Sequence, residues 1–257
     1  MIRRLAFVVR MFFSSFKQWN ITAWLSFWFG KVRKVNLNNH EISVRGESLV
    51  NKISDLAMAW EVFVDNVYDV FEISKDDTIV DIGGHIGSFT VKAANLCPAG
   101  HVYTFEPFPP TFSILDENVK GINNVTIFNK AVSDHTGKER LYVSNKNPAE
   151  NSLLRTTDIH TTVELVSLND IFTDLGIDHI DLLKLDCEGA EYKIISNAKT
   201  KLDHIRKIVM EVHEPKYFNI PSEFTINKLI DTLETAGFAV EFKRENKYQG
   251  YIYAQKT

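Results

Sequence analysis

Regular alternation of strand and helix patterns, from residue 78 onward, is the feature that most constrains the fold. Apolar runs predict seven strands, at residues 78–82, 101–105, 125–131, 180–185, 207–212, 239–244 and 248–254. Helical spacing predicts helices between most of them, at residues 87–96, 110–120, 190–197 and 222–236. Strands joined by helices pair in parallel, whereas only three residues separate the last two strands. We therefore expect an α/β fold with a doubly wound, mostly parallel seven-stranded sheet that ends in an antiparallel hairpin.

The first 40 residues differ in charge from the rest of the chain. They hold seven Lys or Arg residues and no acid, so the other 217 residues hold 22 basic and 33 acidic side chains. Residues 1–31 also hold three of the four tryptophans, and their apolar residues recur at helical spacing. We expect a basic, aromatic, amphipathic helical arm. It either contacts an anionic membrane surface through residues 1–30, which the tryptophans favour, or packs on the body or a partner subunit. A mitochondrial transit peptide is a third interpretation.

Residues 32–77 carry two local patterns. Residues 34–44 alternate around Asn38 and Asn39, which predicts a hairpin, and residues 54–70 have helical spacing. We therefore divide the chain into an arm (1–31), a hairpin and helix (32–77) and an α/β domain (78–257). Within that domain, residues 139–143 predict an additional hairpin, followed by a polar loop at 144–161 and a short strand at 163–166.

Targeting signals are weak. The two cysteines, Cys97 and Cys187, have no neighbours at metal-ligand spacing, and charges interrupt the apolar stretch at the N-terminus. The longest uncharged run, at residues 18–30, is shorter than the ~20 residues that a membrane-spanning helix needs. We expect a cytoplasmic protein with peripheral membrane contact through the arm.

A glycine-rich turn follows the first predicted strand of the sheet. Residues 80–87 read VDIGGHIG. Glycines let the backbone approach a ligand, and the helix that follows presents its first N–H groups. The second glycine of a dinucleotide-binding turn, which admits the pyrophosphate, is His85 in this chain. The dinucleotide fingerprint therefore fails, but the turn still predicts a ligand where the strand meets the helix.

Titratable side chains follow the neighbouring strands. Glu106 comes 25 residues after Asp81 and is placed to accept hydrogen bonds from both hydroxyls of a ribose. The carboxyl ends of parallel strands face one crevice, so we expect the side chains that follow the later strands to meet there as well. These are Asp186, Glu188, Glu211 and His213.

Three blocks of the sequence resemble the FkbM family of S-adenosylmethionine-dependent methyltransferases. They are VDIGGHIG at 80–87, FEP at 105–107 and LLKLDCEGAE at 182–191, with partial matches at 166–170 and 42–68. The resemblance covers residues 40 to 254 and leaves the arm outside. It implies a Rossmann-like class I methyltransferase fold and S-adenosyl-L-methionine as the cofactor.

The resemblance also implies a set of cofactor-binding residues. Asp81, Gly83 and Gly87 would contact the methionine part, Glu106 the ribose, and Ala131 and Val132 the adenine. Gly84 and His85 stand where the family usually has Ala and Asn, so His85 either replaces that Asn as a polar contact or alters the pocket. The full set is Asp81, Gly83, Gly84, His85, Gly87, Glu106, Pro107, Ala131, Val132 and Ser152.

Methyl transfer to a hydroxyl requires an acceptor oxygen in line with the sulfonium and a group that removes one proton. We expect His213 or Asp186 to be this base, with Glu188 and Glu211 orienting the acceptor or a divalent cation such as Mg²⁺. The resemblance implies small-molecule or glycan hydroxyls as acceptors, and the arm favours a lipid-linked one.

Two other functions stay open. An NAD-dependent oxidoreductase would use the same crevice, although His85 disfavours it. A non-catalytic membrane-associated protein would keep only the methyltransferase fold. The acids at positions 81, 106, 186 and 188 argue against the loss of a functional site. Nucleic acid is disfavoured as a partner, because the acidic body would repel phosphates and no Asn-Pro-Pro-aromatic or Asp-Pro-Pro-aromatic run follows Asp186.

Overall fold

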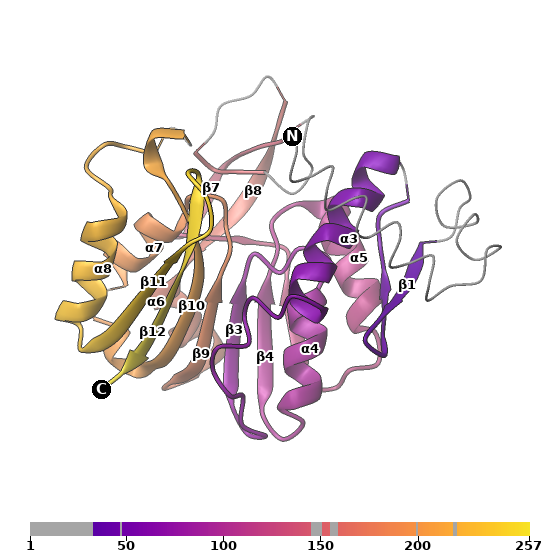
Figure 1. Cartoon of the computed structure of the whole chain (residues 1–257), viewed down its shortest axis with the longest axis horizontal. Coiled ribbons are helices and arrows are strands. Elements are labelled where there is room, and N and C mark those ends of the chain that lie inside the picture. Colours follow the sequence, from indigo (N-terminus) through magenta and orange to yellow (C-terminus); the bar gives the residue numbers. More distant parts are fainter. Residues whose placement is uncertain (1–32, 47, 145–150, 155–158, 199, 218–219) are drawn as a thin grey trace.

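The computed structural model describes residues 33–46, 48–144, 151–154, 159–198, 200–217 and 220–257. The predicted arm at residues 1–31 lies outside them. A seven-stranded sheet with the order β11-β12-β10-β9-β3-β4-β5 forms the centre (Figure 1). Its strands are β3 (Thr78–Ile82), β4 (His101–Phe105), β5 (Val125–Phe128), β9 (Ile180–Leu185), β10 (Ile205–His213), β11 (Phe238–Arg244) and β12 (Gln249–Lys256).

The direction of the strands confirms the predicted sheet. Strands β3, β4, β5, β9 and β10 pair in parallel, and β12 pairs antiparallel with both β10 and β11. All six residues of β9 are buried, as expected for a parallel strand that is covered by helices on both faces. The carboxyl ends of β10, β9, β3 and β4 are therefore neighbours at one edge of the sheet.

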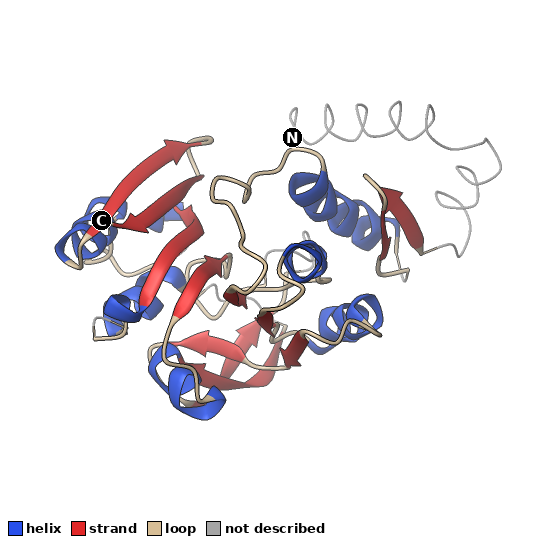
Figure 2. Ribbon diagram, turned by 90° about the horizontal axis from the view of Figure 1, so that it is seen from below, coloured by secondary structure: helices blue, strands red, loops and turns tan. Residues whose placement is uncertain are grey.

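Helices cover both faces of the sheet (Figures 1 and 2). One face carries α3 (Leu49–Phe63), α4 (Ser88–Leu96) and α5 (Pro109–Val119), and the other carries α6 (Leu168–Leu175), α7 (Glu191–Asn197) and α8 (Ile226–Thr235). Successive residues of a strand enter opposite cores, because side chains alternate along it. Ile79 packs with the first group of helices, whereas Val80 packs with the second. Two single-turn 3₁₀ helices, Leu202–His204 and Pro215–Tyr217, complete the helical elements of the described residues.

The hairpin predicted around two asparagines is present. β1 (Lys34–Leu37) pairs antiparallel with β2 (His40–Ser43), and Asn38 and Asn39 adopt φ values of 48° and 68°. Asparagine tolerates this left-handed conformation better than most residues, so the turn follows directly from the sequence. The hairpin and α3 share a core with α4 and α5, while the division into domains stays a prediction.

The helix predicted at 54–70 is wrong at both ends. Helix α3 begins at Leu49, because the Ser48 side chain caps it by accepting a hydrogen bond from the Asn51 N–H. It ends at Phe63, shortly before Asn66 turns the chain with a φ of 53°. The residues after α3 therefore form an irregular segment that reaches the edge of the sheet.

The strand predicted at 125–131 is also wrong, because it is two strands in different sheets. β5 ends at Phe128, and β6 (Ala131–Ser133) joins β8 (His160–Ser167) and β7 (Gly137–Tyr142) in a separate sheet with the order β6-β8-β7. Between β5 and β6, the Asn129 side chain donates hydrogen bonds to the carbonyls of Glu106 and Pro107 and so fixes the turn. No helix among the described residues combines the length and apolarity needed to cross a bilayer.

Candidate active site

The turn after β3 lies against the turn after β9, and glycine makes this approach possible. Gly83 has a φ of 80°, and a Cβ there would lie 1.8 Å from the carbonyl oxygen of Asp186. Gly87, at the start of α4, has a φ of 88°, and its Cβ would lie 2.6 Å from Leu115 Cδ1. Close packing of the turn thus requires glycine at both positions, while the cofactor contacts predicted for them stay predictions.

Asp81 is fully buried at the end of β3 and supports this turn through Lys184. Its Oδ1 lies 3.0 Å from the Lys184 Nζ, and its Oδ2 accepts a hydrogen bond of 2.8 Å from Thr90. Lys184 Nζ also donates to the carbonyl of Gly83, at 2.7 Å. Sequence reasoning assigned Asp81 to the cofactor and gave Lys184 no role, although a lysine in a fully buried strand was a signal that it has a carboxylate partner.

Gly84 is coupled to a residue of the next strand. A Cβ at Gly84 would lie 2.2 Å from Cγ2 of Thr104, which is itself fully buried on β4. The Thr104 hydroxyl donates to Thr90, the residue that supports Asp81. The glycine that stands here in place of the usual alanine therefore makes room for a threonine methyl group.

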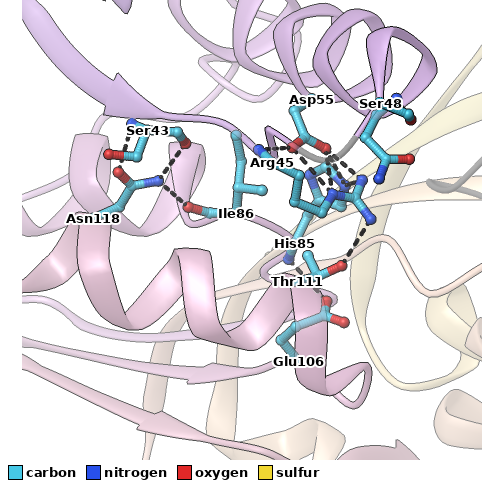
Figure 3. A network of polar contacts seen from close by, with 10 residues as sticks. Ser43, Arg45, Ser48, Asp55, His85, Ile86, Glu106, Thr111 and Asn118 are labelled. Atoms are coloured by element: carbon cyan, nitrogen blue, oxygen red, sulfur yellow. Dashed lines mark hydrogen bonds and ion pairs between the residues drawn. The ribbon is translucent and has the colours of Figure 1, made fainter. Parts of the chain in front are cut away.

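His85 turns its backbone toward Glu106 and its ring toward Arg45 (Figure 3). Its N–H donates to Glu106 Oε2 at 3.0 Å, and its Nε2 lies 3.2 Å from Arg45 Nη2. Burial, and then the charge of Arg45, lowers the pKa of His85 to about 3. The imidazole is therefore neutral, and Nε2 accepts a hydrogen bond from the guanidinium.

Arg45 joins α3, α5 and the turn that carries His85 through one buried guanidinium (Figure 3). It is paired with the Asp55 carboxylate on α3, and both side chains are essentially inaccessible to solvent. Its Nη1 donates to Thr111 on α5 at 3.1 Å. Sequence reasoning missed this pair, because Arg45 and Asp55 lie in different elements and no local spacing joins them.

Glu106 lies at the end of β4, and both of its carboxylate oxygens are held by backbone. Oε1 accepts from the Phe108 N–H at 2.9 Å, and Oε2 accepts from the His85 N–H. Burial raises the pKa of Glu106 to about 7, although these two N–H groups and the charges of Arg45 and Lys184 act to lower it. Each oxygen keeps a lone pair for a further donor.

Asp186 and Glu188 lie in the turn after β9. The Asp186 N–H donates to the Ile82 carbonyl, and its Oδ2 accepts from the Tyr68 hydroxyl at 2.9 Å. Glu188 has a φ of 53°, and its carbonyl accepts a hydrogen bond of 2.7 Å from Ser152. Ser152, predicted to lie near the cofactor, thus uses its hydroxyl to hold the Glu188 turn.

His213 ends β10 and is surrounded by carboxylates. Its Nε2 lies 3.5 Å from Glu188 and 3.9 Å from Glu211, and its Nδ1 lies 3.6 Å from Glu191. Burial acts to lower the pKa of His213, but these carboxylates outweigh it and raise the pKa to about 10. The pKa of Glu211 is raised well above its usual range by burial and then by Asp186. Of the four residues, only Glu191 was not among the predicted catalytic residues.

A family model described as a methyltransferase FkbM domain matches residues 81–242. The chain belongs to the FkbM methyltransferase family. It is 27% identical over 210 residues to Methyltransferase 1 of Beauveria bassiana, covering 72% of this chain and 81% of that protein. It is 25% identical to the 2-O-methyltransferase NoeI of Sinorhizobium fredii (66% and 76% covered) and 27% identical to the 31-O-demethyl-FK506 methyltransferase FkbM of Streptomyces tacrolimicus (74% and 84% covered).

Among solved structures, the chain is similar to a methyltransferase FkbM from Methylobacillus flagellatus, with a TM-score of 0.48 and 13% identity. The match covers 72% of this chain and 45% of that one, so this FkbM domain spans less than half of the solved protein's length. Membership in the FkbM family makes methyl transfer, rather than hydride transfer, the activity class of the chain.

Two predictions about this FkbM site, the general base and the Mg²⁺ ion, can be compared with the structure. The carboxylates around His213 favour its protonated form, which favours Asp186 over His213 as the general base, although both roles stay predictions. Among the described residues, no three His, Cys, Asp or Glu side chains are arranged to hold a metal ion, so the idea of Mg²⁺ at Asp186, Glu188 and Glu211 has no support. A hollow of about 800 Å³ between α7 and α8 contains none of the predicted site residues.

Ala131 and Val132 lie on β6, beside the end of β4. Both are buried, Ala131 in a small core that Phe108 contacts and Val132 in the main core with Phe105. This places them next to the loop that carries Glu106 and Pro107. The position is compatible with the adenine contact that the FkbM resemblance implies.

Proposed function

We propose that this chain transfers a methyl group from S-adenosyl-L-methionine to a hydroxyl oxygen of a sugar, a glycolipid or another natural product. The observation that carries the proposal is the convergence of the Gly83 turn, Glu106 and Asp186 at the carboxyl ends of three neighbouring strands. Ligands of open α/β sheets bind at this edge. Relatives named as a 2-O-methyltransferase, a 31-O-demethyl-FK506 methyltransferase and a hexuronic acid methyltransferase support oxygen acceptors.

The residues around the turn fit the cofactor. Glu106 is fixed by two N–H groups, so its remaining lone pairs suit the two ribose hydroxyls. Gly83 and Gly87 give the turn its tight shape, with φ values of 80° and 88°, and we assign the methionine part of the cofactor to this turn. When bound, the cofactor supplies an electrophilic methyl group on a cationic sulfonium.

In this proposal, the acceptor lies on the Asp186 side of the site. We assign removal of the hydroxyl proton to Asp186, because this residue directly follows β9 and its backbone carbonyl lies against Gly83 of the glycine turn. Glu188 and Glu211 orient the acceptor, and the His213 ring, whose Nε2 lies 3.5 Å from Glu188 and 3.9 Å from Glu211, holds these two side chains in place.

The arm at residues 1–30, outside the described residues, would bring the enzyme to an anionic membrane surface where lipid-linked acceptors lie. The enzyme would then be a peripheral protein on the cytoplasmic side. The alternative is that the arm packs on the body or on a partner subunit. A liposome-binding experiment distinguishes this alternative from membrane contact.

Calorimetry with S-adenosylhomocysteine and with NAD tests the cofactor. We expect the wild type and the control Glu234→Ala, an exposed residue on α8, to bind S-adenosylhomocysteine but not NAD. Glu106→Ala should bind it at least tenfold more weakly, since a charge-assisted hydrogen bond is worth roughly 1.5–3 kcal/mol. Release of S-adenosylhomocysteine over a panel of sugar, glycolipid and polyketide hydroxyls then tests the transfer. Binding of NAD alone, or no transfer to any hydroxyl, would reject the proposal.

A further inference from the structure

Tyr68 brings a hydroxyl from outside the α/β domain to the turn after β9. It lies in the irregular segment after α3, and only 4% of its surface is exposed. Its hydroxyl donates a hydrogen bond of 2.9 Å to Asp186 Oδ2, across 118 residues of sequence. Burial, and then Asp186, raises the pKa of Tyr68 well above its usual range, so this hydroxyl keeps its proton and acts as a donor.

The Tyr68 ring is held from several sides. It meets Phe89 of α4 edge to face, with centroids 5.6 Å apart, and Tyr251 of β12 at 6.2 Å. Lys184 Nζ lies 5.4 Å from the ring centroid. Aromatic and cation–π contacts of this kind fix a ring's position, so the hydroxyl has one direction in which to point.

The segment that carries Tyr68 is itself anchored. Lys92 on α4 donates hydrogen bonds of 2.8 Å to the Val62 carbonyl and to the Asn66 side chain. The Tyr253 hydroxyl donates to the Val67 carbonyl at 3.2 Å. Lys92 also donates to Asp69, so the residues on both sides of Tyr68 are tied to the body, which is what a residue that positions another group requires.

Asp186 is thereby fixed at both its backbone and its side chain. Its N–H donates to the Ile82 carbonyl at 3.0 Å, while Tyr68 occupies Oδ2. The second carboxylate oxygen, Oδ1, is then the one that can face an acceptor. The other charged or titratable groups around it include Glu61 on α3, His85 in the glycine turn, Lys184 on β9, Cys187 and Glu188 after β9, Glu211 on β10 and Tyr251 on β12.

From this geometry we propose that Tyr68 is a positioning residue, which fixes the Asp186 carboxylate so that Oδ1 points at the acceptor hydroxyl. This inference rests on the proposed function, in which Asp186 removes the acceptor proton. It makes the segment before the α/β domain part of the catalytic apparatus.

A double-mutant cycle in the full-length protein tests the inference. Tyr68→Phe removes only the hydroxyl, and we expect it to lower kcat between about tenfold and 100-fold, as misplaced catalytic groups do, while the affinity for S-adenosylhomocysteine stays within about twofold. In an Asp186→Ala background, the same change should lower kcat no further. Tyr248→Phe is the matched control, because it removes a tyrosine hydroxyl from an exposed residue that has no role in the site, and it should leave kcat within about twofold.

Thermal unfolding provides a readout that needs no acceptor. Tyr68→Phe should lower the melting temperature of the wild type but not that of Asp186→Ala, because the hydrogen bond is already absent there. Equal shifts in both backgrounds, or full activity of Tyr68→Phe beside an active wild type, would overturn the inference. A wild type that binds no S-adenosylhomocysteine would instead reject the proposed function, while the unfolding cycle would still report whether Tyr68 holds Asp186.

Discussion

Glu106 is a carboxyl group whose protonation changes close to neutral pH. Burial raises its pKa from the usual 4.5 to about 7. Because the folded state then binds this proton more tightly than the unfolded state, Glu106 makes the protein less stable as the pH rises from about 4.5 to about 7. A ribose donates hydrogen bonds, so it prefers the ionised form. Cofactor binding and proton release at Glu106 are therefore coupled.

The first prediction follows from this coupling. We expect the affinity for S-adenosylhomocysteine to rise between pH 6 and pH 8, around the pKa of about 7, with release of a proton on binding. Glu106→Gln should bind more weakly, and this rise should be lost. Calorimetry in two buffers with different ionisation enthalpies measures the proton directly. A wild-type affinity that does not change over this range would contradict the assignment of the ribose to Glu106.

The second prediction concerns the steric pair of Gly84 and Thr104. Gly84→Ala places a Cβ 2.2 Å from Thr104 Cγ2, and we expect it to lower the free energy of unfolding by roughly 1–3 kcal/mol. Thr104→Ser removes that methyl group and keeps the hydroxyl. The double variant should therefore be more stable than the sum of the single changes, as measured by urea unfolding. If the two changes in the free energy of unfolding simply add, the steric contact between Gly84 and Thr104 is not the cause of the loss.

At the scale of elements, the Arg45–Asp55 pair joins β2 and α3 to the glycine turn. Our third prediction is that Arg45→Met lowers the free energy of unfolding by about 3–5 kcal/mol, because it leaves the buried Asp55 carboxylate without its charge partner. The exposed pair of Arg33 and Glu117 provides the control, since Arg33→Met should cost less than about 1 kcal/mol. If urea unfolding gives the same loss of free energy of unfolding for both variants, the buried pair stabilises the fold no more than the exposed pair does.

The elements that could be predicted are those with a strong local signal. Asn38 and Asn39 specify their hairpin, and the strands of the parallel sheet follow from apolar runs. The ends of α3 could not be placed by apolar spacing, because Ser48 decides where the helix begins. The break between β5 and β6 depends on the Asn129 side chain bonding to the carbonyls of Glu106 and Pro107, which the local pattern does not reveal.

At the scale of the whole molecule, the motifs predicted which side chains meet at one edge of the sheet, but not the contacts that support them. Glu106, Asp186 and Glu188 could be placed because parallel strands share an edge. Tyr68, Arg45 and Lys184 could not be assigned partners, since their contacts join distant parts of the chain. The protonation of His213 also depends on three carboxylates meeting in space, so its role could not be read from its position in a strand.

The fourth prediction concerns the basic arm. Deleting residues 1–30 should abolish partitioning to anionic liposomes, because it removes the aromatic residues and four of the basic charges that favour such a surface. Transfer to a water-soluble acceptor should stay within about twofold, since the arm lies outside the matched family domain. Neutral liposomes provide the control. Unchanged partitioning to anionic liposomes would leave self-packing or a partner subunit as the role of the arm.

The order of strands in the sheet has a consequence for biosynthesis. β12 is the last strand of the sheet to leave the ribosome, yet it lies between β10 and β11. Until residues 249–256 have emerged, β10 presents a long, apolar and unpaired edge, and β11 has no neighbour. Open edges of this kind invite pairing with other chains. The nascent protein therefore passes through a stage at which the open edge of β10 can pair with another chain before β12 occupies it.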